Sequence, residues 1–211
     1  RGGLWSILGP GGWTMSVATK LAGIDLLDPS GKKVRLGDMW GEKPVVLAFI
    51  RHFGCLFCRE QVADLRGELK QIHDRGAELV VVGNGRPEQA RDFKEKQKIT
   101  FPLLTDPALE AYRAAGLRRG LISSLGPRSM LHGLRALSSG NVQTSVKGDP
   151  WQQGGVFVIT PAGKVLFTQR SKEAGDHADT ADILAALDKP RKKKPDGAKA
   201  RRPKSAKRQV K

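Results

Sequence analysis

The only two cysteines of the chain, Cys55 and Cys58, are separated by two residues. Arginines lie on both sides of the pair, Arg51 before it and Arg59 directly after it. A cysteine reacts as its thiolate, and nearby positive charges or a Cys-x-x-Cys arrangement lower the thiol pKa from about 8.5 into a range of about 3.5–7.5. The spacing and the flanking charges therefore predict a redox-active pair.

The surrounding residues place this pair where a buried strand is followed by a helix. Residues 44–50 form an unbroken apolar run that begins with a proline, as is typical of a buried strand. After the pair, apolar residues recur every three or four positions, as on one face of a helix: Cys58, Val62, Leu65, Leu69 and Ile72. The first turn of a helix has unpaired N–H groups and the positive end of the helix dipole, which stabilise a thiolate. We expect Cys55 to be the exposed nucleophile, and Cys58, one turn later, to close a disulfide with it.

Two other interpretations of the cysteines have less support. A structural zinc site needs two more ligands, and the four histidines contain no ligand-like pair: His52, His73, His132 and His177. Inert buried cysteines would require neither a strand-to-helix turn nor flanking arginines. The sequence therefore predicts neither a metal nor a cofactor at the pair.

Residues 51–60, followed by Ala63-Asp64-Leu65, resemble the peroxiredoxin-like, selenoprotein-U-like branch of the alkyl hydroperoxide reductase/thiol-specific antioxidant superfamily. The resemblance resumes at Gly140-Asn141 and in residues 154–158, and it ends with residues 170–176. It covers roughly residues 20–188. It implies an α/β, thioredoxin-like fold, with a central mixed sheet flanked by helices, and thiol-based redox activity.

The chain also departs from the pattern of ordinary peroxiredoxins, Pro-x-x-x-Thr-x-x-Cys, whose last cysteine attacks peroxide. Aligned on Cys58, that pattern places Arg51 at the proline and Cys55 at the threonine. Gly154 stands where those enzymes have an arginine before a late strand, and no cis-proline equivalent of thioredoxins stands before Val156. Either cysteine is therefore a candidate for the attacking one.

The remaining elements follow from turn signals and apolar periodicity. We expect the cysteine helix to end near Gly76, and Trp40 to pack over the sheet. The pattern predicts two hairpins, in residues 23–36 and 154–169, a strand over 78–83 parallel to the first, and a short strand over 101–104. It predicts three helices: one over 87–98, one from Asp106-Pro107 to about 115, and a last one that follows Asp176 and His177 and ends at about 187. Adjacent Asp176 and His177 are expected to cap that last helix or to contact solvent rather than to act as an acid–base pair.

Charge and composition divide the chain into a domain with two extensions. Of the net charge of +16, +11 falls on residues 189–211, which contain twelve Lys or Arg and one Asp. We expect this basic tail to be disordered and able to bind nucleic acid without base selectivity. Residues 1–14 are glycine-rich and are expected to lie outside the redox domain, which spans 15–188 and includes a helical insertion over 117–147 carrying His132. No apolar run of membrane-spanning length occurs, and without a signal segment the expected compartment is the cytoplasm.

The leading expectation is a thiol oxidoreductase that reduces peroxides through Cys55 and Cys58, assisted by Arg51 and Arg59. Its partners would be a peroxide and a thiol reductant of the thioredoxin or glutathione type. Two alternatives remain open. One is a thioredoxin-like protein disulfide reductase that uses the same residues, and the other is a nucleic-acid-associated protein acting through residues 189–211.

Overall fold

The computed structural model describes residues 16–120 and 147–188. Within them, seven strands form one mixed sheet in the order β2-β1-β5-β4-β3-β6-β7. The strands are β1 (Asp25–Leu27), β2 (Lys33–Arg35), β3 (Val45–Phe49), β4 (Glu78–Gly83), β5 (Leu103–Thr105), β6 (Gly155–Ile159) and β7 (Val165–Arg170). Both hairpins predicted from the sequence, β1–β2 and β6–β7, are confirmed as antiparallel pairs.

The centre of the sheet consists of β3 and its two neighbours. β3 pairs in parallel with β4, where Phe49 lies opposite Val82, and antiparallel with β6, where Phe49 lies opposite Gly155. Every residue of β3 and β6 is buried, which explains the unbroken apolar runs, because a strand covered on both faces has no polar side. The carboxyl ends of β3 and β4 therefore lie side by side, and the chain leaves both strands at one edge of the sheet.

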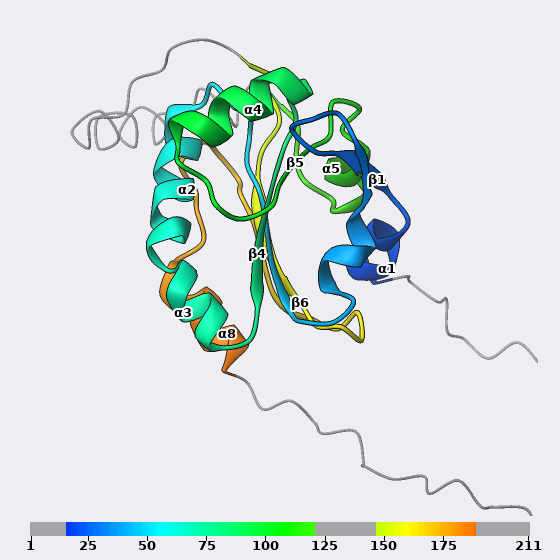
Figure 1. Cartoon of the computed structure of the whole chain (residues 1–211), viewed down its shortest axis with the longest axis vertical. Coiled ribbons are helices and arrows are strands. Elements are labelled where there is room, and N and C mark those ends of the chain that lie inside the picture. Colours follow the sequence, from blue (N-terminus) through cyan, green and yellow to red (C-terminus); the bar gives the residue numbers. More distant parts are fainter. Residues whose placement is uncertain (1–15, 121–146, 189–211) are drawn as a thin grey trace, which may run out of the picture.

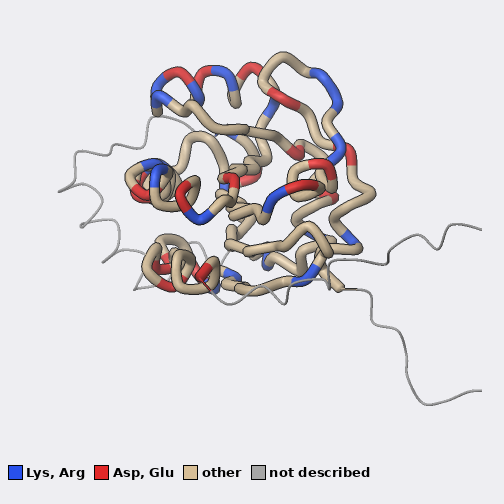
Figure 2. Tube along the Cα trace, turned by 60° about the horizontal axis from the view of Figure 1, so that its bottom comes forward, with Lys and Arg blue, Asp and Glu red and all other residues tan. Residues whose placement is uncertain are grey.

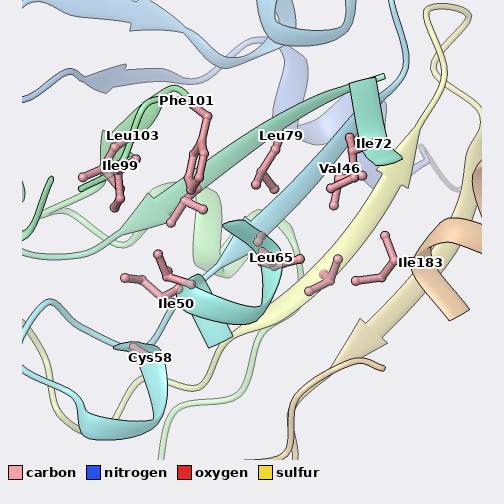
Figure 3. Close-up of a cluster of buried hydrophobic side chains, with 14 of the residues drawn as sticks. Val46, Ile50, Cys58, Leu65, Ile72, Leu79, Ile99, Phe101, Leu103 and Ile183 are labelled. Atoms are coloured by element: carbon pink, nitrogen blue, oxygen red, sulfur yellow. The ribbon is translucent and has the colours of Figure 1, made fainter. Parts of the chain in front are cut away.

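Helices cover both faces of the sheet (Figure 1). One core lies under α2 (Leu56–Gly67), α3 (Leu69–Asp74), α4 (Pro87–Lys96) and α8 (Thr180–Leu187). The other lies under α1 (Val17–Ala22), the 3-10 helix η1 (Leu36–Trp40) and α5 (Glu110–Ala114), and it includes Trp40 as predicted. Figure 3 shows the first core, in which Cys58, Leu65 and Ile72 lie between α2–α3 and the strands. The predicted apolar stripe is confirmed, with Leu69 partly buried and its other members buried.

The helix that follows the cysteines is interrupted, whereas the sequence predicted one continuous helix to Gly76. The break between α2 and α3 lies at Glu68, where ψ is 1°. Gly67 directly precedes it, and glycine is about 1 kcal/mol less favourable than alanine inside a helix. Gly76 has a positive φ of 66° and ends the helical segment at the predicted place.

The helix predicted from Asp106-Pro107 begins later than expected, at Glu110. Leu109 has a left-handed conformation, with φ 57°, so helical geometry starts only after it. The Asp106 carboxylate still accepts a hydrogen bond from the Ala111 N–H at 2.7 Å. The acid therefore supports the start of the helix as predicted, although from further upstream.

Three predicted segments extend beyond the described residues. Of the helical insertion predicted over 117–147, residues 121–146 lie outside them, and residues 117–120 are not helical but reach Gln152 through an isolated bridge from Arg119. The predicted extension 1–14 and the basic tail 189–211 also lie outside. Figure 2 shows Lys and Arg interspersed with Asp and Glu over the described part, for example along α4. No helix in residues 16–120 or 147–188 has the length and apolar character that crossing a membrane requires.

Candidate active site

The two cysteines lie in the turn that leads from β3 into α2. Cys55 is the residue that precedes α2, with extended backbone angles (φ −73°, ψ 127°), and Cys58 lies in the first helical turn. A residue in the position of Cys55 directs its side chain at the unpaired N–H groups of the first turn. The N–H groups of Phe57 and Cys58 lie in this first turn and favour the charged form of Cys55, although Cys55 makes no side-chain capping hydrogen bond. The predicted strand–cysteine–helix arrangement is thus present.

The pKa of the Cys55 thiol is lowered to about 6. The largest cause is a hydrogen bond from the Cys58 thiol, and burial acts against it by disfavouring the charged form. The positive charge of Arg51 lowers the pKa further, since its Nη1 lies 3.5 Å from Cys55 Sγ. The helix N–H groups add to the same effect. Cys55 therefore has the surroundings of a thiolate at neutral pH.

Cys58 has the opposite character. Burial and the neighbouring Cys55 sulfur raise the pKa of its thiol well above the ordinary value. The backbone N–H of Arg51 donates a hydrogen bond to Cys58 Sγ at 3.2 Å. The surroundings of the pair therefore favour the thiolate at Cys55 and the thiol at Cys58.

Cys55 is buried, with 2% of its surface exposed, so the prediction of an exposed nucleophile is wrong. Residues 147–150, distant in sequence, contact the cysteine turn. The N–H of Phe53 donates to the Lys147 carbonyl at 3.0 Å, and Nη2 of Arg51 donates to the Pro150 carbonyl at 2.6 Å. The sequence around the cysteines carries no sign of these contacts, because they come from a segment almost a hundred residues away.

The two predicted arginines lie differently. The Arg51 side chain reaches the Cys55 sulfur, as described above. Arg59 donates its backbone N–H to the Cys55 carbonyl at 3.3 Å, while its side chain lines a small basic hollow beside the site. Other residues lining that hollow are Phe53, Phe93, Lys96, Gln97 and Lys147. The Arg51 guanidinium lies within hydrogen-bond distance of a cysteine sulfur.

Gly154 lies beside the end of β3, the strand that leads into the cysteine turn. A Cβ at this position would collide with the Phe49 carbonyl oxygen at the end of β3 and would lie 3.6 Å from Ile50 Cα. Only glycine fits at this position, because any side chain would clash with the backbone of the strand that leads into the turn. Among the described residues no peptide bond is cis, so the thioredoxin-type cis-proline has no counterpart there.

Three buried polar residues at the site were not singled out as site residues from the sequence. His52 Nδ1 accepts the Gly54 N–H at 3.2 Å, and burial, followed by the Arg51 charge, lowers the pKa of His52 to about 4. Tyr112 donates its hydroxyl to the Ile50 and Val82 carbonyls at 2.5 and 3.0 Å, joining the ends of β3 and β4. Asn84 follows β4 and donates to the Arg51 carbonyl at 2.5 Å. Its position just after a strand parallel to β3 is the signal that could have identified it.

Of the other described histidines, His73 pairs with Glu78 and His177 lies elsewhere on the surface. His132 lies outside the described residues. His177 lines a broad surface hollow of about 1070 Å³ between the second half of α2 and the β7–α8 connection, away from the cysteines. Asp176 accepts the Lys172 N–H at 2.7 Å through its carboxylate, so it stabilises the loop before α8 rather than capping the helix. The cap of α8 is Asp179, so of the two expected roles, capping and solvent contact, Asp176 does not fill the first.

Comparison with known proteins identifies the family of the chain. Residues 64–173 match the family described as AhpC/TSA antioxidant enzyme, a match that begins after the cysteines. The thioredoxin-like protein AAED1 (chloroplastic) of Arabidopsis thaliana is 32% identical over 80% of this chain and 72% of its own length. Peroxiredoxin-like 2C of Mus musculus is 30% identical over 80% of this chain and 79% of its own.

A solved structure shares the fold. Peroxidoxin BcpB from Mycobacterium tuberculosis superposes with a TM-score of 0.58 at 24% identity, covering 78% of this chain and 90% of that chain. The predicted thioredoxin-like fold, a mixed sheet flanked by helices, is thereby confirmed. The chain belongs to the AhpC/TSA antioxidant enzyme family and is a peroxiredoxin-like thiol oxidoreductase.

Proposed function

We propose that this enzyme reduces peroxides with Cys55 as the attacking residue and Cys58 as the resolving residue. The Cys55 thiolate attacks one peroxide oxygen, the O–O bond breaks, and the departing alkoxide or hydroxide takes up a proton and leaves as alcohol or water. Cys55 is now a sulfenic acid. The Cys58 thiol attacks its sulfur, water is released, and a Cys55–Cys58 disulfide forms. Each cycle thus reduces one peroxide by two electrons.

The observation that carries this assignment is the hydrogen-bonded pair of unlike sulfurs beside Arg51. The lowered pKa of Cys55 supports a thiolate there, and the raised pKa of Cys58 supports a thiol that waits for the sulfenic acid. The Arg51 guanidinium, 3.5 Å from Cys55 Sγ, can also stabilise negative charge on the departing oxygen. In this respect the chain differs from the alignment with ordinary peroxiredoxins, which would assign the attack to Cys58.

Burial favours a small oxidant over a protein disulfide. With 2% of Cys55 exposed, a hydroperoxide group needs only a narrow opening, whereas a protein disulfide must bring two sulfurs and their backbones in line with Cys55 Sγ. The disulfide reductase alternative therefore requires the surroundings of Cys55 to open first. We rank it second for this reason.

The cycle needs an external thiol that returns the disulfide to the dithiol state. A thioredoxin- or glutathione-type reductant supplies two electrons and two protons and leaves as a disulfide. We infer a reducing compartment such as the cytoplasm, since the pair must be re-reduced after each turnover. The name of the Arabidopsis relative gives a chloroplast location for that protein.

The test compares hydrogen peroxide, an organic hydroperoxide and insulin disulfides as substrates for the reduced enzyme. We expect rapid thiol loss with the peroxides and slow or no reduction of insulin. Cys55→Ser should abolish peroxide consumption, whereas Cys58→Ser should consume one equivalent and accumulate a sulfenic acid that dimedone traps on Cys55. A sulfenic acid trapped on Cys58 in Cys55→Ser would reverse the assignment. Turnover of insulin without turnover of peroxides would support the disulfide reductase instead.

A further inference from the structure

We propose that Asn84 is a positioning residue, which holds residues 148–150 against the cysteine turn so that the Pro150 carbonyl directs the Arg51 guanidinium at Cys55. This inference rests on the proposed function, in which the Arg51–Cys55 contact stabilises the attacking thiolate. Asn84 touches neither sulfur. It acts on Arg51 from both ends, through the Arg51 backbone and through the segment that holds the Arg51 side chain.

Asn84 is 4% exposed and lies directly after β4, next to the cysteine turn. Its Nδ2 donates to the Arg51 carbonyl at 2.5 Å and to the Asp149 carbonyl at 3.4 Å. Its Oδ1 accepts the Asp149 N–H at 2.9 Å. Both amide hydrogens and the amide oxygen are therefore used, and the orientation of the amide is fixed because a flipped group would place its oxygen against two carbonyls.

Gly148 shows how closely the segment approaches Asn84. It has a positive φ of 113°, and a Cβ at this position would collide with Asn84 Oδ1 and lie 3.1 Å from His52 Cβ. Any other residue would both strain the backbone and separate the segment from the turn. Glycine at 148 and asparagine at 84 thus form one contact, made between two segments that are far apart in the sequence.

The contact between Asn84 and Gly148 affects the chemistry because the residues beside it hold the Arg51 guanidinium. Two residues beyond Gly148, the Pro150 carbonyl accepts Nη2 of Arg51 at 2.6 Å, and Nη1 of the same guanidinium lies 3.5 Å from Cys55 Sγ. Asp149 is also held by Arg119, whose Nε donates to its Oδ2 at 2.5 Å. The guanidinium is therefore aimed from one side by a carbonyl whose position depends on Asn84. When that segment loosens, Arg51 gains freedom to rotate away from the sulfur.

The test measures the rate at which iodoacetamide alkylates Cys55 as a function of pH, resolved by peptide mass, in the full-length reduced protein. Asn84→Asp keeps the shape and the acceptor for the Asp149 N–H but turns the donor into an oxygen that faces two carbonyls. Gly148→Ala disturbs the same contact from the other side and leaves Asn84 in place. We expect both to raise the pH midpoint of alkylation by about 0.5–1 unit, and so to slow the reaction about 3- to 10-fold below the midpoint.

Ile72→Val is the matched control. Ile72 is fully buried in α3 and none of the site contacts involves it, so this variant lowers the melting temperature without disturbing the turn. It should retain the wild-type midpoint. Wild-type midpoints in both Asn84→Asp and Gly148→Ala, with folded circular dichroism spectra, would overturn the positioning role. Because alkylation involves no peroxide, that result would leave the proposed peroxide reduction standing. A failure of the wild-type enzyme to reduce peroxides would appear in the peroxide assay instead.

Discussion

Replacing Cys58 by alanine or by serine isolates the hydrogen bond that it gives to Cys55. Serine retains an O–H that can donate to the Cys55 thiolate, whereas alanine retains no donor. A hydrogen bond to a charged group contributes about 1.5–3 kcal/mol, and one pKa unit corresponds to about 1.36 kcal/mol. Loss of the donor should therefore raise the pKa of Cys55 by about 1–2 units from its value of about 6.

At pH 7 this shift has a measurable consequence. The ionised fraction of Cys55 should fall from about nine-tenths in Cys58→Ser to between about a half and a tenth in Cys58→Ala. Because each variant has a single cysteine, the pH profile of iodoacetamide alkylation reports Cys55 alone. Coincident midpoints for Cys58→Ala and Cys58→Ser would refute the reasoning, since they would show that the Cys58 donor is not the main source of acidity.

Three further predictions follow from the contacts around the turn and from the charge of the tail. Arg51→Met should raise the alkylation midpoint of Cys55, whereas Arg59→Met, its neighbour on the other side of the pair, should leave it unchanged; equal effects of the two would contradict the 3.5 Å contact of Arg51. The pKa of His52 is about 4 in the folded chain and 6.5 when unperturbed, so the unfolded chain binds its proton more tightly. The free energy of unfolding is therefore unaffected by this proton above pH 6.5, and it falls by up to about 3 kcal/mol as pH decreases through about 4. Urea unfolding of wild type and of His52→Asn should show a smaller loss between neutral pH and about pH 4.5 in the variant, and equal losses would exclude His52 as the source. Finally, the full chain should retard random duplex DNA in a gel in a salt-sensitive manner, and a chain without residues 189–211 should not; unchanged binding after truncation would contradict the role predicted for the tail.

Local pattern was sufficient to predict the elements that carry the cysteines. The apolar run of β3 and the stripe from Cys58 to Ile72 are local features, and together they locate the pair at the start of a helix. The proximity of Arg51 to the sulfurs also follows from its position in the short turn between these elements. The bounds of α2 and α5 were less accurate, because Gly67-Glu68 and Leu109 change the backbone within a single residue, and periodicity averages over several.

Burial of the pair could not be predicted, because it depends on contacts between segments far apart in the chain. Cys55 looked exposed when only the turn was considered, but it is buried, and residues 147–150 return from far along the chain to contact that turn. In the sequence, only its position directly after a predicted parallel strand distinguishes Asn84 from an ordinary loop asparagine. Its role emerges only when β4 is placed parallel to β3 and Gly148 is brought against it.

Peroxide reduction through Cys55 and Cys58 is tested most directly by the intact mass of the reduced wild-type protein after one equivalent of an organic hydroperoxide. The account predicts a loss of two hydrogen atoms, with peptide mapping that recovers Cys55 and Cys58 joined in one intramolecular disulfide and an equivalent amount of the alcohol in solution. An unchanged mass with both thiols still free, or a disulfide between two chains in place of the internal one, would contradict it.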